Sequence, residues 1–132
     1  MAFEGKLYVH ERDDNFDGFI ASLGLPEDKV ERLKNYKPNH KLEKNGDTYT
    51  MSSLSESRNH IITFKLGEEF DETVVEGRTA KTTFTLDGNT LTQVQKFAEG
   101  TITTKREYSS DKLVVTINRS NWDGTATRYY KV

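Results

Sequence analysis

Beyond residue 36, turn-forming residues recur about every ten positions, and this spacing limits the possible folds more than any other feature. Asn, Asp, Gly and Ser favour tight turns, and they cluster at residues 45–47, 76–77, 87–89, 99–100, 109–111 and 121–124. All sixteen threonines also lie in this part of the chain, and β-branched residues suit a pleated sheet. The pattern predicts strands near residues 4–12, 37–44, 48–54, 59–66, 69–74, 79–86, 90–97, 101–108, 112–119 and 125–132.

Ten short strands joined by tight turns indicate an all-β fold, an antiparallel up-and-down β-barrel, because closing the sheet on itself removes exposed strand edges. Residues 15–36 are the exception, since apolar side chains recur there with helical spacing at Phe16, Phe19, Ile20 and Leu23. Gly24 favours the end of this helix and Pro26 the start of a second one. The sequence therefore predicts a ten-stranded barrel capped by a helix-turn-helix.

Length, charge and cysteine content narrow the class of protein. The 132 residues suit a single domain, 1–132, and the net charge of −2 argues against a nucleic-acid partner, which requires a basic excess. Without cysteine the chain can form neither a disulfide nor a thiolate metal site. Residues 1–6 contain no apolar run typical of a signal peptide, and no apolar stretch is long enough to span a membrane. We expect a soluble, cytoplasmic protein.

Strand alternation indicates that polar side chains point into the barrel. One face of residues 101–108 is wholly polar, so Arg106 belongs to the opposite, inward face. By the same reasoning Arg128 and Tyr130 point inward, and Gln93 and Gln95 share the inward face of residues 90–97. The hydrophobic fraction of 33% is low for a globular chain. It fits either an unusually polar surface or a partly polar, hollow interior.

Two inward arginines require a counter-charge, because a buried guanidinium group does not lose its proton. One explanation is an anion bound by these groups inside a water-filled cavity. The alternative is that either arginine pairs with an internal Asp or Glu, or reaches the mouth of the barrel. The residue pattern by itself leaves both explanations open.

Five segments carry a resemblance to a known family. They are KLY at residues 6–8, NFDGFI at 15–20, FKLGEEFDE at 64–72, KLVV at 112–115 and RYY at 128–130. In these segments, which span essentially the whole chain, the sequence resembles the intracellular lipid-binding proteins, which include the fatty-acid-binding and retinoic-acid-binding proteins. The resemblance implies a clam-shaped barrel (β-clam) capped by two helices, with one lipid in an internal cavity.

The resemblance also implies roles for particular side chains. It implies that Arg106, Arg128 and Tyr130 bind the carboxylate of the ligand. The cavity wall would include Phe16, Met51, Ile62, Phe64, Gln95 and Val115, to which strand alternation adds Gln93. The ligand would enter beneath the second helix, through a portal formed by Val30, Leu33, Ser57 and Val75. Ser57 stands where several vertebrate members have phenylalanine, so a gate built on that ring is not expected here.

We therefore expect a non-enzymatic intracellular carrier of a long-chain fatty acid that needs no cofactor. Retinoic acid or another carboxylated lipid is an alternative ligand, because the same cations would hold its carboxylate. An enzyme acting on a bound lipid is a further alternative, but it needs a nucleophile and a base in contact, and the sequence has no such motif. We expect a monomer that touches membranes only transiently, through its helical cap.

Three other groups of residues predict no separate chemistry. His10, His40 and His60 lack the spacing of metal ligands, so no metal site is expected. The acidic run at residues 68–72 is interpreted as a solvated connection between strands. Trp122, which lies in a predicted turn, is expected to pack against its neighbours rather than to bind a ligand.

Overall fold

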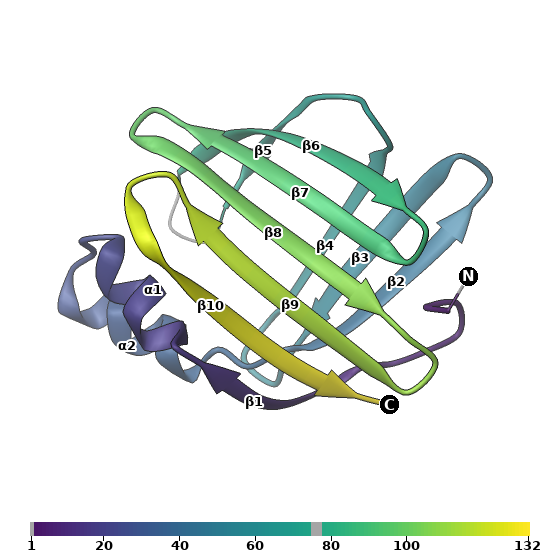
Figure 1. The fold of residues 1–132 in the computed structure, drawn as a ribbon, viewed down its shortest axis with the longest axis horizontal. Helices are drawn as coiled ribbons and strands as arrows, with labels where there is room; N and C mark the ends of the chain where they lie inside the picture. Colours follow the sequence, from purple (N-terminus) through teal and green to yellow (C-terminus); the bar gives the residue numbers. More distant parts are fainter. Residues whose placement is uncertain (1, 75–77) are drawn as a thin grey trace.

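Ten antiparallel strands dominate the structure, a computed structural model that describes residues 2–74 and 78–132 (Figure 1). Most of the connecting turns lie where the sequence predicts them, and Gly46 (φ 65°) and Gly88 (φ 60°) adopt the left-handed backbone that two of these turns require. The strands are β1 (Val9–Asp14), β2 (Asn39–Asn45), β3 (Thr48–Leu54), β4 (Asn59–Lys65), β5 (Phe70–Thr73), β6 (Thr79–Asp87), β7 (Thr90–Phe97), β8 (Gly100–Tyr108), β9 (Lys112–Arg119) and β10 (Trp122–Lys131).

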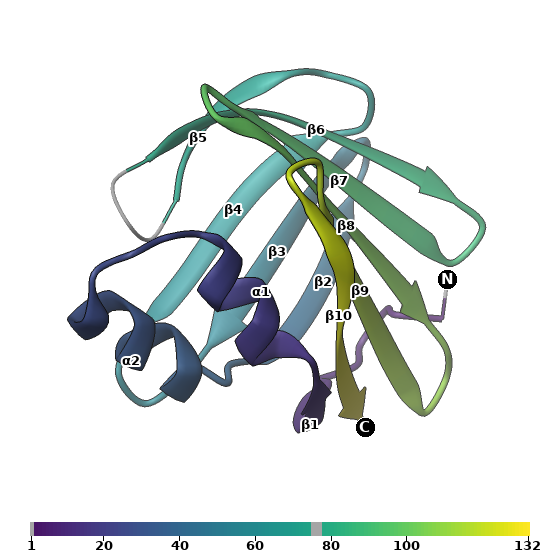
Figure 2. The ribbon, with the colours of Figure 1, turned by 60° about the vertical axis from the view of Figure 1, so that its left-hand side comes forward.

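The strands form two sheets that face each other. One sheet has the order β1-β10-β9-β8-β7-β6-β5, and the other has the order β2-β3-β4 (Figure 2). In the described part of the chain β4 and β5 are not hydrogen-bonded to each other, so the barrel is open between them. A single bridge between Tyr8 and His40 links the other two sheet edges. The predicted antiparallel β-clam is therefore confirmed.

The first and last strands differ from their predicted bounds. Residues 2–5 form a turn instead of the start of a strand, and this turn places Phe3, which is fully buried, in the core. β1 begins only at Val9, the first residue that pairs with β10, whereas Tyr8 bridges to His40. At the other end the turn takes up only Ser120 and Asn121, so β10 begins at Trp122, with an irregular register before Ala126.

Two short helices cover one end of the barrel, as the sequence predicts (Figure 2). Helix α1 (Phe16–Ser22) packs against β10, and its Ile20 is fully buried. Gly24, just after the end of α1, has the left-handed backbone (φ 65°) that is typical of a helix C-terminus. Helix α2 (Glu27–Asn35) begins after Pro26, with acidic residues in its first turn and basic residues in its last, which suits the helix dipole.

Aromatic rings stack on one another in the core between the two sheets. They come from strand segments near the β2–β3 and β6–β7 turns, and Figure 1 shows these turns at the end of the barrel away from the helices. Phe84 is fully buried, and its ring centroid lies 3.8 Å from that of Phe64. Tyr49 and Phe70 extend the stack on either side. This apolar packing lies outside the cavity, which residues of both helices line together with polar side chains.

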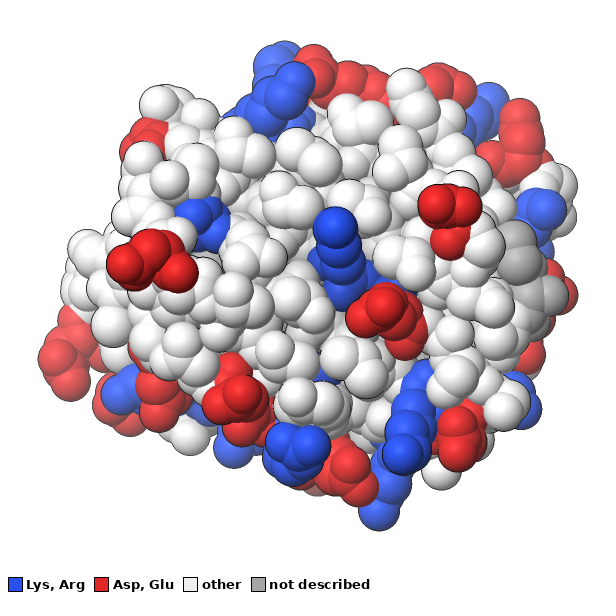
Figure 3. Space-filling model, in the orientation of Figure 1, with Lys and Arg blue, Asp and Glu red and all other residues white. Residues whose placement is uncertain are grey.

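The surface carries charges of both signs. On the face shown in Figure 3, blue and red side chains alternate around the edge, and no large patch of one sign is visible. The net charge of −2 is therefore not concentrated on this face. None of the helices in residues 2–74 and 78–132 is long and apolar enough to cross a membrane.

Candidate ligand-binding site

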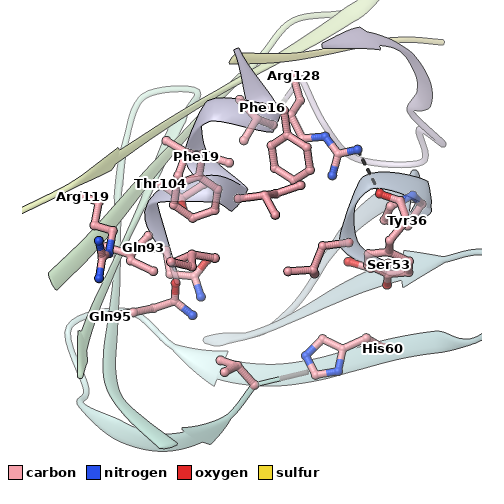
Figure 4. A pocket seen from close by; sticks show the side chains of 18 of the residues that line it. Phe16, Phe19, Tyr36, Ser53, His60, Gln93, Gln95, Thr104, Arg119 and Arg128 are labelled. Carbon is pink, nitrogen blue, oxygen red and sulfur yellow. Dashed lines mark hydrogen bonds between the residues drawn. The ribbon is translucent and has the colours of Figure 1, made fainter. Parts of the chain in front are cut away.

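A cavity of about 300 Å³ lies between the two sheets and beneath both helices. Its volume is at the lower end of the roughly 300–1,000 Å³ range of small-molecule sites. Polar side chains from β5, β7, β8 and β10 share this cavity with an apolar wall (Figure 4). The apolar wall consists of Phe16, Phe19, Ile20, Leu23, Leu25, Leu33, Met51, Val74, Phe97, Ile102, Val115 and Ile117.

Arg128 points into the cavity from β10, as alternation predicts, but it has internal partners. Its Nε donates to Oδ1 of Asp13 at 2.9 Å, and its Nη2 donates to the Tyr36 carbonyl oxygen at 3.0 Å (Figure 4). Its guanidinium carbon lies 4.0 Å from the centre of the Phe16 ring, a cation–π contact. Arg128 thus links β10 to β1 and to both helices. Of the two explanations for an inward arginine, pairing with an internal acidic residue holds for Arg128.

His10 completes the cluster around Asp13. Its Nε2 lies 2.7 Å from Asp13 Oδ1, and its ring packs edge-on against the ring of Tyr130. Burial alone would raise the pKa of Asp13, but the hydrogen bonds with Arg128 and His10 outweigh it and lower that pKa. Tyr130 itself is buried, which raises the pKa of its hydroxyl and keeps it a hydrogen-bond donor.

Arg106 also lines the cavity, but fewer of its donors are engaged. Its Nη1 donates to Gln93 Oε1 at 2.8 Å, and Gln93 Nε2 donates in turn to Glu72 Oε1 at 3.2 Å. Nε and Nη2 of Arg106 form no hydrogen bond with any residue that the structure describes. Burial lowers the pKa of Arg106, and the nearby Tyr108, Tyr130 and Glu72 oppose that change. The guanidinium group therefore faces the cavity with donors to spare.

His40 is a buried titratable group in the cavity with a strongly lowered pKa. It is 6% exposed, and its Nε2 lies 2.6 Å from the hydroxyl oxygen of Tyr108. Burial, together with the charge of Arg106, lowers the pKa of His40 to about 3. Burial also raises the pKa of Tyr108, so both groups are neutral at physiological pH.

Comparison with known proteins identifies the family. A model described as the lipocalin / cytosolic fatty-acid binding protein family matches residues 1–125. The chain belongs to this family. Fatty acid-binding protein 1 of Manduca sexta is 49% identical to it over 131 residues, which is 99% of each chain. The fatty acid-binding protein of Tyrophagus putrescentiae is 38% identical over 125 residues, 94% of this chain and 93% of that one.

Solved structures agree with this assignment. The fatty-acid-binding protein isolated from Manduca sexta superposes with a TM-score of 0.91 at 45% identity, covering 98% of this chain and 99% of that one. The fatty acid binding protein of Schistosoma mansoni, in complex with arachidonic acid, gives 0.89 at 31% identity, covering 98% and 95%. Family and relatives are binding carriers rather than enzymes, so the expectation of a non-enzymatic protein is confirmed.

The structure brings most, but not all, of the expected wall residues together. Ile62 and Phe64 are not among the residues that line the cavity, because Phe64 stacks between Tyr49 and Phe84 and Ile62 packs against the same core. Those that do line it are Phe16, Met51, Gln93, Gln95 and Val115.

The expected portal residues are dispersed. Leu33 lines the cavity, whereas Val30 is half-buried outside it and Ser57 is exposed. Val75 lies outside the described residues. A contact between two other residues links the β3–β4 turn to the end of α2: the guanidinium carbon of Arg58 lies 4.9 Å from the centre of the Tyr36 ring.

Several side chains in the site were not identified from the sequence. Asp13 and His40 point inward from β1 and β2, where mixed polar segments give no clear alternation. Glu72 was expected in a solvated connection, but it is 7% exposed and lines the cavity. The sequence did contain a sign of this burial, because Glu72 follows Phe70 by two residues and so lies on the same face of the strand.

The remaining expectations concern the histidines and Trp122. No group of three metal-ligating side chains gathers anywhere in residues 2–74 and 78–132. Trp122 is half-buried, and its ring centroid lies 6.0 Å from that of Phe19, so it packs against α1 as expected.

Proposed function

We propose that the protein is a carrier that binds one long-chain fatty acid inside the cavity, with the ligand carboxylate held by Arg106, Arg128 and Tyr130. The observation that carries the proposal is that the guanidinium groups of Arg106 and Arg128 and the buried Tyr130 line the same cavity, which also has an extensive apolar wall. Fatty-acid-binding relatives and the complex of one of them with arachidonic acid support the choice of lipid.

The energetics require both parts of this site. Burying a tail of about 16 carbons gains roughly 12 kcal/mol at ~0.8 kcal/mol per methylene. Association and ordering cost about 4–15 kcal/mol, so the tail alone does not ensure tight binding. Charged hydrogen bonds of about 1.5–3 kcal/mol each then orient the head group and discriminate between acids and neutral lipids.

The two arginines are expected to contribute differently. Arg128 already binds Asp13 through Nε and Nη2 and the Tyr36 carbonyl through Nη2, which leaves Nη1 for a ligand. Arg106 keeps Nε and Nη2 free of hydrogen bonds to the described residues. The geometry therefore favours a two-point contact at Arg106, completed by single contacts from Arg128 and Tyr130.

Replacing either arginine with glutamine should weaken acid binding selectively. We expect the affinity for palmitate to fall about 10- to 100-fold for Arg106→Gln and for Arg128→Gln, equivalent to about 1.4–2.8 kcal/mol. The affinity for hexadecanol should change much less, because its head group carries no charge. Calorimetric titration of both ligands into each variant measures the two effects and the stoichiometry of one.

Arg119→Gln is the matched control. Arg119 also lines the cavity, but its Nη1 donates to the Ser22 carbonyl oxygen at 2.8 Å, away from the carboxylate site. It should retain most of the palmitate affinity. Equal losses for palmitate and hexadecanol in Arg106→Gln and Arg128→Gln would show that the arginines shape the cavity and do not bind the carboxylate.

We further propose that ligand passes between α2 and the β3–β4 turn, where Arg58 contacts Tyr36. A cation–π contact at an exposed position contributes about 0.5–1 kcal/mol. Arg58→Ala should therefore raise both the association and the dissociation rate about 2- to 5-fold, with little change in Kd. Stopped-flow transfer of a fluorescent fatty acid measures both rates.

Arg32→Ala on α2 is the control for this prediction. Arg32 is exposed and pairs only with Asp28 on the same helix, at 3.6 Å, among the described residues. It carries the same charge on the same cap but bridges no elements, so its rates should match the wild type. If Arg58→Ala also matches the wild type, ligand does not pass at this contact.

A further inference from the structure

The cavity contains a second polar centre, on β5, β6 and β7, that the proposed carboxylate site does not use. Glu72 lies at this centre and is 7% exposed, and the neighbouring Thr82 and Gln93 are 0% and 3% exposed. A carboxylate buried to this degree requires hydrogen bonds in place of water. Glu72 and Gln93 both line the cavity, and Figure 4 shows Gln93 beside Gln95 on its wall.

The hydrogen bonds that the Glu72 carboxylate accepts from the described residues all reach the same oxygen, Oε1. Oε1 accepts from Thr82 Oγ1 at 2.8 Å, from Gln95 Nε2 at 3.1 Å and from Gln93 Nε2 at 3.2 Å. Oε2 accepts no hydrogen bond from any residue in the described part of the chain. Oε2 is also accessible to solvent or ligand. Among the described residues, the Tyr36 hydroxyl oxygen is the only fully buried side-chain nitrogen or oxygen atom without a hydrogen-bond partner, so Oε2 is not fully buried.

The arrangement therefore presents a fixed acceptor to the inside of the cavity. Thr82 and the two glutamines hold the carboxylate in place, and an ionised carboxylate accepts hydrogen bonds but cannot donate them. An unsubstituted lipid chain passing Oε2 would remove water from it and offer nothing in return, which is unfavourable. A chain with a hydroxyl at that point would replace the lost hydrogen bond with a charge-assisted one.

We propose that Glu72 binds a hydroxyl group on the chain of the bound lipid, so that the cavity favours hydroxylated fatty acids over unsubstituted ones. This inference rests on the proposed function, because the carboxylate at Arg106 fixes where the chain begins. The side chain of Gln93 alone bridges Arg106 and Glu72. The recognised hydroxyl therefore lies on the carboxyl half of the chain.

The first test compares stearate with hydroxystearates whose hydroxyl is moved stepwise from C2 to C12. In the wild type we expect one or two neighbouring isomers in the carboxyl half to bind about 10-fold more tightly than stearate. The oxostearate with a ketone at the same carbon should gain nothing, because it offers Glu72 no donor. If stearate binds but no isomer exceeds it, the inference is wrong and the proposed carrier function stands; if stearate itself does not bind, the carrier function fails.

The second test changes the acceptor into a donor. Glu72→Gln keeps a carbonyl oxygen that accepts from Thr82, Gln93 and Gln95 but places an NH₂ group, which is a donor, where Oε2 was. The preference for the hydroxy acid over the oxo acid should fall from about 10-fold to near or below one, because the amide can donate to the ketone. Were Glu72 only a counter-charge for Arg106, the variant would raise the affinities of stearate, hydroxy acid and oxo acid together.

Glu69→Gln is the matched control for charge. Glu69 is exposed, and its Oε2 lies 3.8 Å from Lys96 Nζ. The variant therefore removes the same charge from the same segment, at a side chain that does not line the cavity. Its selectivity between hydroxy and oxo acids should equal that of the wild type. A hydroxyl preference that survives in Glu72→Gln would assign the recognition to another residue and overturn the inference.

Discussion

Replacing His40 with glutamine is expected to reduce the loss of stability that acid causes in the wild-type protein. The pKa of His40 is about 3 in the folded protein because of burial and the nearby Arg106, whereas an unfolded histidine has a pKa of about 6.5. Between these two values only the unfolded chain takes up the proton, so acid favours unfolding. The stability is complete above pH ~6.5 and declines by about 1.4 kcal/mol per pH unit below it.

The full effect amounts to about 5 kcal/mol by pH 3, and about 2.7 kcal/mol is already lost at pH 4.5. His40→Gln keeps a polar partner for Tyr108 but cannot take up the proton. Urea unfolding of both proteins at pH 7, 6, 5 and 4.5 isolates the contribution of His40, because the other titrating groups are shared. Parallel stability profiles would contradict the prediction and show that protonated His40 is accommodated in the folded state.

Replacing Asp13 with asparagine should destabilise the protein without ligand and strengthen its binding of fatty acid. Asp13 and Arg128 form an ion pair at 2.9 Å, with side chains 18% and 8% exposed. Removing one member of such a pair leaves the other charge buried and uncompensated, which costs about 3 kcal/mol. A ligand carboxylate at Arg128 would restore the missing negative charge. We expect palmitate affinity to rise about 10-fold, or about 1.4 kcal/mol.

Asp14→Asn is the control for this variant. Asp14 is the next residue of β1 and is exposed, so the charge change is identical but Arg128 keeps its partner. Its free energy of unfolding should stay within about 0.5 kcal/mol of the wild type. Urea unfolding with and without saturating palmitate, with calorimetric titration, measures both effects. Weaker palmitate binding in Asp13→Asn would mean that Asp13 positions Arg128 for the ligand rather than competing with it.

The ion pair also corrects a simple expectation about Arg128. If Arg128 lacked an internal partner, as one interpretation of the sequence holds, its removal would stabilise the protein without ligand. Because Asp13 and the Tyr36 carbonyl bind it, Arg128→Gln should instead lower the stability. The alternation pattern identifies an inward arginine, but it carries no information about which side chain from a distant strand lies opposite.

Strand alternation located inward polar residues on β7, on β8 and on β10 after Ala126, because the pairing there is regular and continuous. Arg106, Gln93 and Tyr130 each occupy the inward face that period-two spacing assigns to them. Such faces depend only on local backbone geometry. The same reasoning failed for Glu72, because its strand is only four residues long and lies within an acidic run that resembles a surface loop.

The sequence by itself determined the number and direction of the strands, the two capping helices and the family. Turn residues, β-branched stretches and the helical stripe in residues 16–23 act within a few positions of one another, so they can be recognised without the fold. Only the tertiary structure decided which charges meet. Asp13 and Arg128 are 115 positions apart, and His40 and Tyr108 are 68 apart. Such pairs depend on sheet order and register, and burial then sets their pKa values.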